Sequence, residues 1–152
     1  MLITGQQKLE RMRDGRAVYI GAERVEDVTR HPAFRAGAAT IAGLYDLKAD
    51  QAKHNLFTYE ENGERFALHW LRCRDGADLA RRMRASKALA DATYGLMGRS
   101  PDHVAGTLTG LAMNPGLLDR LHAGFGQNLL AYYQHARRND LYLSYAVTPP
   151  RA

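Results

Sequence analysis

One short segment, YGLMGRSPDH at residues 94–103, constrains the fold of this chain more than any other. It carries the signals that end one helix and begin the next. Gly95 and Gly98 suit the sharp turn that follows a helix, because glycine adopts left-handed backbone conformations without steric cost. Ser100 followed by Pro101 is typical of a helix start, with serine as the N-cap and proline in the first turn. The segment therefore predicts two helices that meet at a tight corner.

Arg99 lies at this corner, between the glycines and the next helix. A guanidinium held there could bind an anionic oxygen through charge-assisted hydrogen bonds. Asp102 follows in the first helical turn, where the helix dipole favours a carboxylate. The same spacing is also typical of an ordinary connector with a solvated arginine, and spacing alone favours that interpretation.

The residues before the corner predict helices and a small hairpin. A capping-box pattern at residues 4–7 predicts a first helix that runs to about Arg13. Residues 16–25 alternate in character and contain Gly21, which predicts a hairpin. A second helix is expected from about His31, and its apolar stripe should face the core. The stripe consists of Phe34, Ala38, Ile41 and Tyr45.

Asn62 and Gly63 give the strongest local signal in the chain. A type I′ hairpin turn requires positive φ at both central positions, and this dipeptide tolerates both. The register that follows pairs Phe57 with Leu68, Tyr59 with Phe66, and Glu60 with Arg65.

The residues on either side of this hairpin are interpreted as structural. Residues 48–54 are polar and lose periodicity, which predicts a surface loop, and His54 has no partner at metal-ligand spacing. Trp70 is expected on the apolar face of the hairpin and His69 on the opposite face.

The rest of the chain predicts three long helices. The first should run from Asp75 or Asp78 to the corner, with its arginines facing solvent, and the others should cover residues 101–113 and 117–138. The expected core positions are Leu79, Met83, Leu89, Ala90 and Leu96, then Val104, Leu108 and Leu111, then Leu118, Leu121, Phe125, Leu129 and Tyr132.

A change to period two near the end predicts a closing strand. It includes Leu141, Leu143, Tyr145 and Val147, and Pro149 followed by Pro150 would stop it. The predicted fold class is mainly α with small β-hairpins, in which the helices form a bundle-like layer. A length of 152 residues fits a single domain.

Composition excludes several classes of protein. No apolar run approaches the roughly 20 residues that a membrane span needs, and no signal-peptide segment follows Met1, so a cytoplasmic location without a membrane partner is expected. The single cysteine excludes an intramolecular disulfide, and no metal site is expected.

The chain is basic, with 21 Lys and Arg against 16 Asp and Glu, which raises the question of nucleic acid. The basic residues on one predicted helix have no aromatic residues interleaved among them and no recognised nucleic-acid module around them. They are interpreted as a solvated helix face, and no nucleic-acid partner is expected. They are Arg81, Arg82, Arg84 and Lys87.

Several motifs along the chain, taken in order, resemble one known family. The motif YGLMGRSPD at residues 94–102 is similar to the signature of the 4-hydroxyphenylacetate 3-monooxygenase family, the oxygenase components of two-component phenol hydroxylases. Further similar pieces stand in the same order over essentially the whole chain. They are residues 4–5, 29–34, 44–47, 56–60, 113–115, 139–141 and 145–150.

The resemblance implies a fold and a reaction. The fold would be the N-terminal helical domain of an acyl-CoA dehydrogenase-like flavoprotein. The cofactor would be FAD, used as FADH2 that a separate flavin reductase supplies, and the reaction would hydroxylate a phenol such as 4-hydroxyphenylacetate ortho to its hydroxyl group. Full-length relatives would be homo-oligomeric.

The resemblance also implies roles for particular residues. Arg99 matches the family's substrate-contacting arginine and would stabilise phenolate charge. Two positions differ from the family pattern: this chain has His103 where relatives have tyrosine, and Tyr145 where they have histidine. Both replacements keep a side chain that exchanges protons or donates a hydrogen bond.

The site residues expected from the resemblance fall into three groups. The catalytic group is Arg99, His103 and Tyr145, the substrate-binding group is Arg99, Ser100, Pro101, Asp102 and His103, and the cofactor-binding group is Tyr145, Val147, Thr148 and Pro149. A structural role for His103, in the first turn of a helix, remains the alternative.

Members of this family continue for several hundred residues, through a β-rich domain and a C-terminal helical bundle. Residues 1–152 correspond to the N-terminal helical domain alone, and this domain is expected to be inactive by itself. The alternative is a truncated, non-catalytic remnant or an interaction domain.

Overall fold

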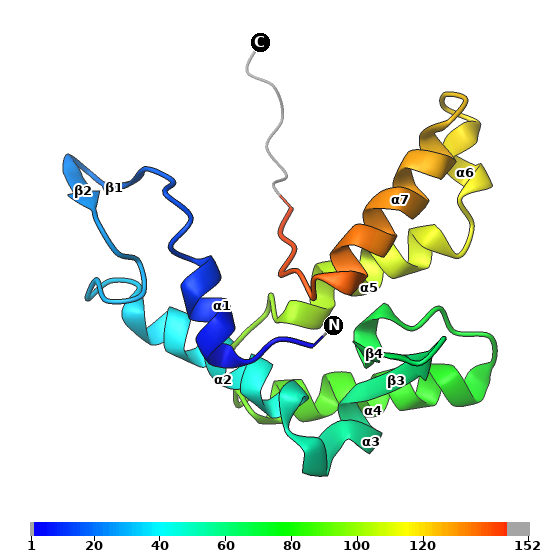
Figure 1. Ribbon diagram of the computed structural model, residues 1–152, viewed down its shortest axis with the longest axis horizontal. Helices are drawn as coiled ribbons and strands as arrows, with labels where there is room; N and C mark the ends of the chain where they lie inside the picture. Colours follow the sequence, from blue (N-terminus) through cyan, green and yellow to red (C-terminus); the bar gives the residue numbers. More distant parts are fainter. Residues whose placement is uncertain (1, 146–152) are drawn as a thin grey trace.

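The computed structural model describes residues 2–145 and shows a mainly helical chain with two small antiparallel hairpins (Figure 1). The helices are α1 (Gly5–Arg11), α2 (Arg35–Ala49), α3 (His54–Phe57), α4 (Gly76–Asp91), α5 (Pro101–Ala112), α6 (Gly116–Asp119) and α7 (Phe125–Arg138). Two 3-10 turns are η1 (Gln51–Lys53) and η2 (Leu68–Trp70). The strands are β1 (Val18–Ile20), β2 (Glu23–Val25), β3 (Thr58–Glu61) and β4 (Glu64–Ala67).

Both hairpins form as the sequence predicts. Strand β1 pairs with β2, and β3 pairs with β4 in the expected register, with Tyr59 opposite Phe66 and Glu60 opposite Arg65. Asn62 has φ 53° and Gly63 has φ 77°, as a type I′ turn requires. The predicted continuation of the ladder is wrong, because the strands end where the chain curls into α3 on one side and η2 on the other.

The core lies where α4, α5 and α7 meet the β3–β4 hairpin and η2. Trp70 and Tyr133 are fully buried, with their ring centroids 6.2 Å apart in an edge-to-face arrangement. Ala105 on α5 is also fully buried, which lets this helix approach η2 closely. The Thr109 hydroxyl donates to the His69 carbonyl at 3.1 Å and joins α5 to η2 directly.

The predicted apolar stripes of α4 and α7 are partly wrong. On α4, Leu79 and Met83 are exposed, whereas Ala85 and Leu89 face the core. The sequence offers several apolar stripes on this helix, and the neighbouring η2 and α3 select the one with small residues. Ala90 and Leu96 are exposed as well.

The predicted long helix over residues 117–138 is divided in two. Gly124 has φ 88°, and α7 begins only after it. The helix then buries Tyr133 and Ala136. The prediction that Phe125 and Tyr132 lie in the core is wrong, because both are exposed. Leu121 is exposed too.

Two further predictions, the surface loop at residues 48–54 and the closing strand, are wrong. Residues 48–54 are not a surface loop: Lys48 belongs to α2 and is buried at 1% exposure, and residues 51–57 form η1 and α3. Residues 141–145 have no strand partner among residues 2–145, and Val147 lies outside the described residues. Segment 141–145 instead leaves the end of α7 and runs between α1 and α5 (Figure 1).

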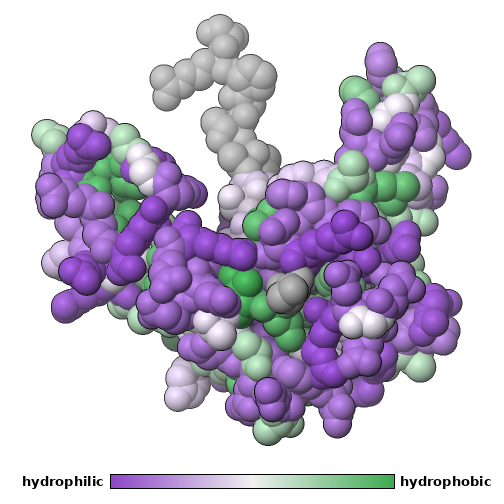
Figure 2. Space-filling view, in the orientation of Figure 1, coloured by the Kyte–Doolittle hydropathy of each residue, from purple (hydrophilic) through white to green (hydrophobic). Residues whose placement is uncertain are grey.

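The arginines of α4 do not all face solvent. Arg82 is half-buried, and its Nη1 atom lies 3.4 Å from the Leu71 carbonyl oxygen. Arg81 is also half-buried, whereas Arg84 and Lys87 are exposed. Figure 2 shows that hydrophilic side chains cover most of one face of the molecule, with hydrophobic patches toward the β1–β2 end, near the centre of the face and toward the α6–α7 end. No helix within residues 2–145 has the length and apolar character to cross a membrane.

Candidate functional site

The predicted corner forms between α4 and α5. Helix α4 ends at Asp91, and the chain then turns through Tyr94 with φ 54° and Gly95 with φ 71°. The Gly95 amide donates to the Ala90 carbonyl at 2.8 Å, which closes the end of the helix. The two residues with left-handed backbone in this corner are thus Tyr94 and Gly95, not Gly95 and Gly98.

Helix α5 begins as expected, but its N-cap side chain differs from the prediction. Ser100 is the N-cap and Pro101 occupies the first turn, where it is buried. The Ser100 hydroxyl does not accept from a backbone amide; it donates instead to the Asp102 carboxylate. This hydrogen bond fixes both side chains beside the exposed Arg99.

Arg99, His103 and Tyr145 lie together at the surface of the corner. Arg99 Nη1 donates to the Tyr145 carbonyl at 3.3 Å, and its guanidinium carbon lies 4.6 Å from the centroid of the Tyr145 ring. The rings of His103 and Tyr145 are 5.8 Å apart, and His103 Nε2 is 3.5 Å from the Tyr145 hydroxyl. A cation, an imidazole and a phenol hydroxyl therefore share one exposed site.

Tyr142 makes the second connection between the corner and segment 141–145. Its hydroxyl donates to the Arg99 carbonyl, and its ring lies 5.3 Å from Lys8 Nζ on α1. Partial burial raises the pKa of Tyr142, so its hydroxyl stays protonated and can donate at neutral pH. The segment is thereby held across the start of α5.

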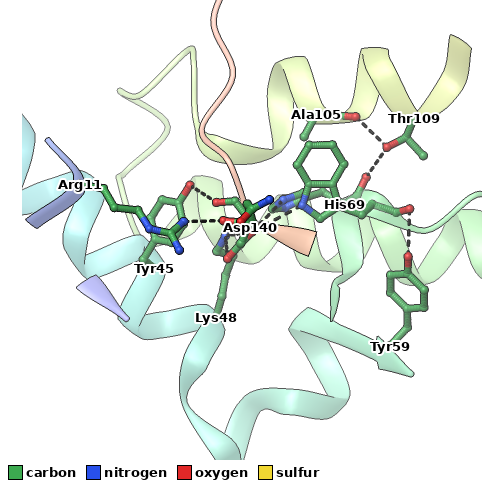
Figure 3. Close-up of polar contacts among 10 residues, drawn as sticks. Arg11, Tyr45, Lys48, Tyr59, His69, Ala105, Thr109 and Asp140 are labelled. Carbon is green, nitrogen blue, oxygen red and sulfur yellow. Dashed lines mark hydrogen bonds and ion pairs between the residues drawn. The ribbon is translucent and has the colours of Figure 1, made fainter. Parts of the chain in front are cut away.

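A buried polar cluster joins α2 to the end of α7 through Asp140 (Figure 3). Lys48 Nζ is 3.0 Å from both carboxylate oxygens of Asp140, and Trp70 Nε1 donates to one of them at 3.5 Å. The Tyr45 hydroxyl donates to the Asp140 carbonyl at 3.0 Å. His69 Nε2 is 3.7 Å from the same carboxylate and has no hydrogen-bond partner within residues 2–145.

Burial and charge set the protonation of this cluster. Burial alone would raise the pKa of Asp140, but the charge of Lys48 holds it well below its usual range. Burial lowers the pKa of Lys48, and Asp140 opposes that shift. Burial and the Lys48 charge also lower the pKa of His69, so its imidazole is neutral at pH 7.

The sequence prediction missed this cluster. The sequence predicts a surface loop for residues 48–54, which include Lys48, and it predicts no role for Asp140 beyond its place in a family-like motif. The available signal was the position of Lys48, which lies three residues after the core residue Tyr45 and so on the same face of its helix.

The remaining predicted site residues cannot be placed. Val147, Thr148 and Pro149 lie outside the described residues. Over residues 2–145, no group of three or more His, Cys, Asp or Glu side chains could hold a metal ion.

Comparison with known proteins gives the family. Residues 4–152 match the sequence model described as the 4-hydroxyphenylacetate 3-hydroxylase N terminal. The chain belongs to this family. The match covers the corner and segment 141–145, and it confirms the resemblance that the motifs carry.

Relatives in the 4-hydroxyphenylacetate 3-hydroxylase family are much longer than this chain. The chain is 39% identical over 150 residues to the oxygenase component of 4-hydroxyphenylacetate 3-monooxygenase from Pseudomonas aeruginosa, covering 97% of this chain and 28% of that protein. It is 36% identical over 151 residues to the oxygenase component of a 4-nitrophenol 2-monooxygenase from Rhodococcus sp., with the same two coverages. The chain therefore spans about 28% of the length of these relatives.

Solved structures agree with the family. The oxygenase component of 4-hydroxyphenylacetate 3-monooxygenase superimposes with a TM-score of 0.91 at 34% identity, covering 99% of this chain and 31% of that one. The same enzyme with FAD and 4-hydroxyphenylacetate superimposes with a TM-score of 0.85 at 35% identity, covering 92% and 29%.

An archaeal 4-hydroxybutyryl-CoA dehydratase superimposes with a TM-score of 0.75 at 18% identity, covering 93% of this chain and 28% of that one, and shows the shared fold alone. The expected fold class, a mainly α N-terminal domain of the acyl-CoA dehydrogenase-like flavoproteins, is confirmed.

Proposed function

We propose that this chain is the substrate-side, N-terminal domain of a reduced-flavin-dependent aromatic monooxygenase that hydroxylates a phenol ortho to its hydroxyl group. One observation carries the proposal: the Arg99 guanidinium, the His103 imidazole and the Tyr145 hydroxyl converge at one exposed site. The substrate class is a phenol such as 4-hydroxyphenylacetate, which a structural relative binds together with FAD.

The residues suit the charge that this reaction develops. Electrophilic attack at the ortho carbon is easier on a phenolate than on a phenol, so stabilising the phenolate oxygen lowers the barrier. Arg99 supplies a permanent positive charge and several N–H donors for that oxygen. His103 can accept the phenolic proton and afterwards donate a hydrogen bond to the oxygen.

Ser100, Pro101 and Asp102 would shape the substrate side of the site. The hydrogen bond between Ser100 and Asp102 fixes the first turn of α5, and the buried Pro101 fixes its backbone. His103 then projects from a rigid turn toward Tyr145. Pre-organised groups of this kind lose little entropy when the substrate binds.

When reduced FAD is bound, it would supply, together with molecular oxygen, the oxygen atom that is transferred to the phenol ring. The described residues fit such a group, because Tyr145 is 43% exposed and presents an aromatic ring beside the Arg99 cation. Tyr145 would hold the flavin together with Val147, Thr148 and Pro149. The role of this chain is to bind the phenol, hold its charge and orient it.

The other expectations complete the proposal. The chain would form one N-terminal helical domain over residues 1–152, receive FADH2 from a separate flavin reductase, and act within a homo-oligomeric longer protein. Because it spans about 28% of its relatives' length, we expect the isolated chain to lack hydroxylase activity.

An activity assay tests the proposed role of Arg99. The chain replaces the corresponding residues of the Pseudomonas aeruginosa relative, and product is measured with a flavin reductase, FAD, NADH and 4-hydroxyphenylacetate. Arg99→Ala should lower kcat by roughly a hundredfold or more, the effect of removing one donor to a developing oxyanion. Arg84→Ala changes an exposed arginine of α4 and is the control, for which no change is expected. Full activity of Arg99→Ala, with unchanged circular dichroism, would exclude the assigned role.

A non-catalytic interaction domain is the second candidate function. It is favoured by large apolar side chains exposed on α4 and the corner: Met83 is 63% exposed, Tyr94 90% and Leu96 88%. Phenol affinity and mass in solution separate the two candidates. A chain that forms a stable complex with another protein and leaves phenols unbound would support the interaction domain.

A further inference from the structure

The buried pair formed by Lys48 and Asp140 has no part in the proposed chemistry. Each side chain is 1% exposed, and both carboxylate oxygens are 3.0 Å from the ammonium nitrogen (Figure 3). A buried ion pair of this kind is on average no more stabilising than apolar side chains of the same volume, because both charges lose their hydration. The pair is therefore expected to have a role other than stabilising the fold.

Asp140 occupies the turn that ends α7. Its φ is 45°, in the left-handed region, its amide donates to the Arg137 carbonyl at 3.3 Å, and the Leu141 amide donates to the Ala136 carbonyl at 3.0 Å. These two bonds define a Schellman motif, in which the left-handed position is usually glycine. A glycine would form the same turn at lower steric cost, but it would have no side chain for Lys48 to hold.

The turn at Asp140 sets the direction of the segment that reaches the site. Two residues later the Tyr142 hydroxyl donates to the Arg99 carbonyl, and further on Tyr145 contacts both Arg99 and His103. The Asp140 carbonyl is also fixed, because the Tyr45 hydroxyl donates to it at 3.0 Å. The side chain of Asp140, through Lys48, and its carbonyl, through Tyr45, are thus both held by the helix α2.

We infer that Lys48 and Asp140 are a positioning pair, which directs segment 141–145 across the start of α5 and thereby holds Tyr145 against Arg99 and His103. The pair touches no reacting group and acts through Tyr145. Its functional value rests on the proposed function, whereas the geometry it enforces does not. Lys48 on α2 would then govern phenol binding at a site formed by the start of α5 and segment 141–145.

Two double variants of the 152-residue chain test this inference. Lys48→Met with Asp140→Asn removes both charges together and leaves no buried unpaired ammonium. Lys48→Met with Asp140→Gly also gives the turn the residue it prefers. The control is Lys87→Met with Asp91→Asn, which removes an exposed ion pair on α4.

The first measurement is the nuclear Overhauser effect between the His103 and Tyr145 rings, recorded without phenol, with circular dichroism as the check of folding. We expect the effect in the wild type and the control, and its loss in both folded double variants. A retained effect in either double variant would overturn the inference. Unfolding of both double variants would overturn it as well, because the pair would then stabilise the whole domain rather than direct one segment.

The second measurement is 4-hydroxyphenylacetate affinity by chemical-shift titration. We expect an affinity about tenfold or more weaker in the double variants than in the control, comparable to the loss of one charge-assisted hydrogen bond. If neither the wild type nor the control binds phenol, the proposed function fails while the ring contact still tests the positioning pair. If phenol affinity is unchanged although the ring contact is lost, the pair positions Tyr145 without serving the site, and the functional part of the inference is wrong.

Discussion

Asp140→Asn on its own probes the electrostatics of the buried cluster. The substitution keeps the size of the side chain but leaves the Lys48 ammonium, which is 1% exposed, without its anionic partner. Removing one partner of a buried ion pair typically costs about 3–5 kcal/mol, because the remaining charge stays desolvated. For a chain of this size each kcal/mol shifts the melting temperature by about 2–4 °C, so we expect a fall of about 6–20 °C.

The destabilisation should depend on pH in a definite direction. Burial already lowers the pKa of Lys48, and the loss of Asp140 removes the main opposing interaction, so the pKa falls further. When the folded-state pKa of a lysine lies below its unfolded value of about 10.4, the unfolded state binds more protons between the two values. The stability of the variant should therefore rise with pH through this window, relative to the wild type.

Urea unfolding measures this directly. Trp70, the only tryptophan in the chain, is fully buried and donates to Asp140, so its fluorescence reports on the cluster. The double variant with Lys48→Met should recover most of the lost stability at pH 7. A loss below about 1 kcal/mol for Asp140→Asn, typical of a surface pair, or no recovery in the double variant, would refute the reasoning.

Three further perturbations have expected outcomes. Gly5→Ala should destabilise the chain by about 1–3 kcal/mol in urea unfolding, because a Cβ there would collide with the Ala42 carbonyl oxygen on α2; an unchanged midpoint would contradict the close approach of α1. Tyr94→Gly should stabilise it by roughly 0.5–1 kcal/mol in thermal unfolding, since a non-glycine residue at φ 54° is strained and this side chain is 90% exposed. Acid should destabilise the wild type as pH falls below about 4, because the pKa of Asp140 is lower in the folded chain than in the unfolded chain. The contribution of Asp140 to the free energy of unfolding is therefore complete above the unfolded-state pKa and is lost as pH falls below it. The Lys48→Met, Asp140→Asn variant should lose less stability across the same pH titration.

Local signals in the sequence predicted the parts of the fold that depend on short-range backbone chemistry. Asn62 and Gly63 specified the β3–β4 turn and its register, because both tolerate positive φ. Thr4 and Gln7 specified the start of α1 through a capping box that forms as expected. The corner that carries Arg99 was predicted for the same reason.

Predictions that needed a choice among helix faces were less successful. Helix α4 offers both Leu79 with Met83 and Ala85 with Leu89 as apolar pairs, and periodicity does not distinguish them. The second pair is buried because it faces η2 and α3, and those contacts join residues far apart in the chain. On α7 the core contains Tyr133 rather than Tyr132, because the Tyr133 ring packs edge-to-face against Trp70. The expected stripe crosses the break at Gly124 and therefore does not fix the face that α7 buries.

The sequence by itself determined where the chain turns, which corner carries Arg99, and, through its motifs, the family. Only the tertiary structure decided which atoms of Tyr145 contact Arg99 and His103, and that Lys48 and Asp140 form a buried pair. The physical reason is distance along the chain: turns and caps depend on neighbouring residues, whereas this ion pair joins residues 92 positions apart. Burial makes the pair possible, and burial is a property of the assembled core rather than of any one segment.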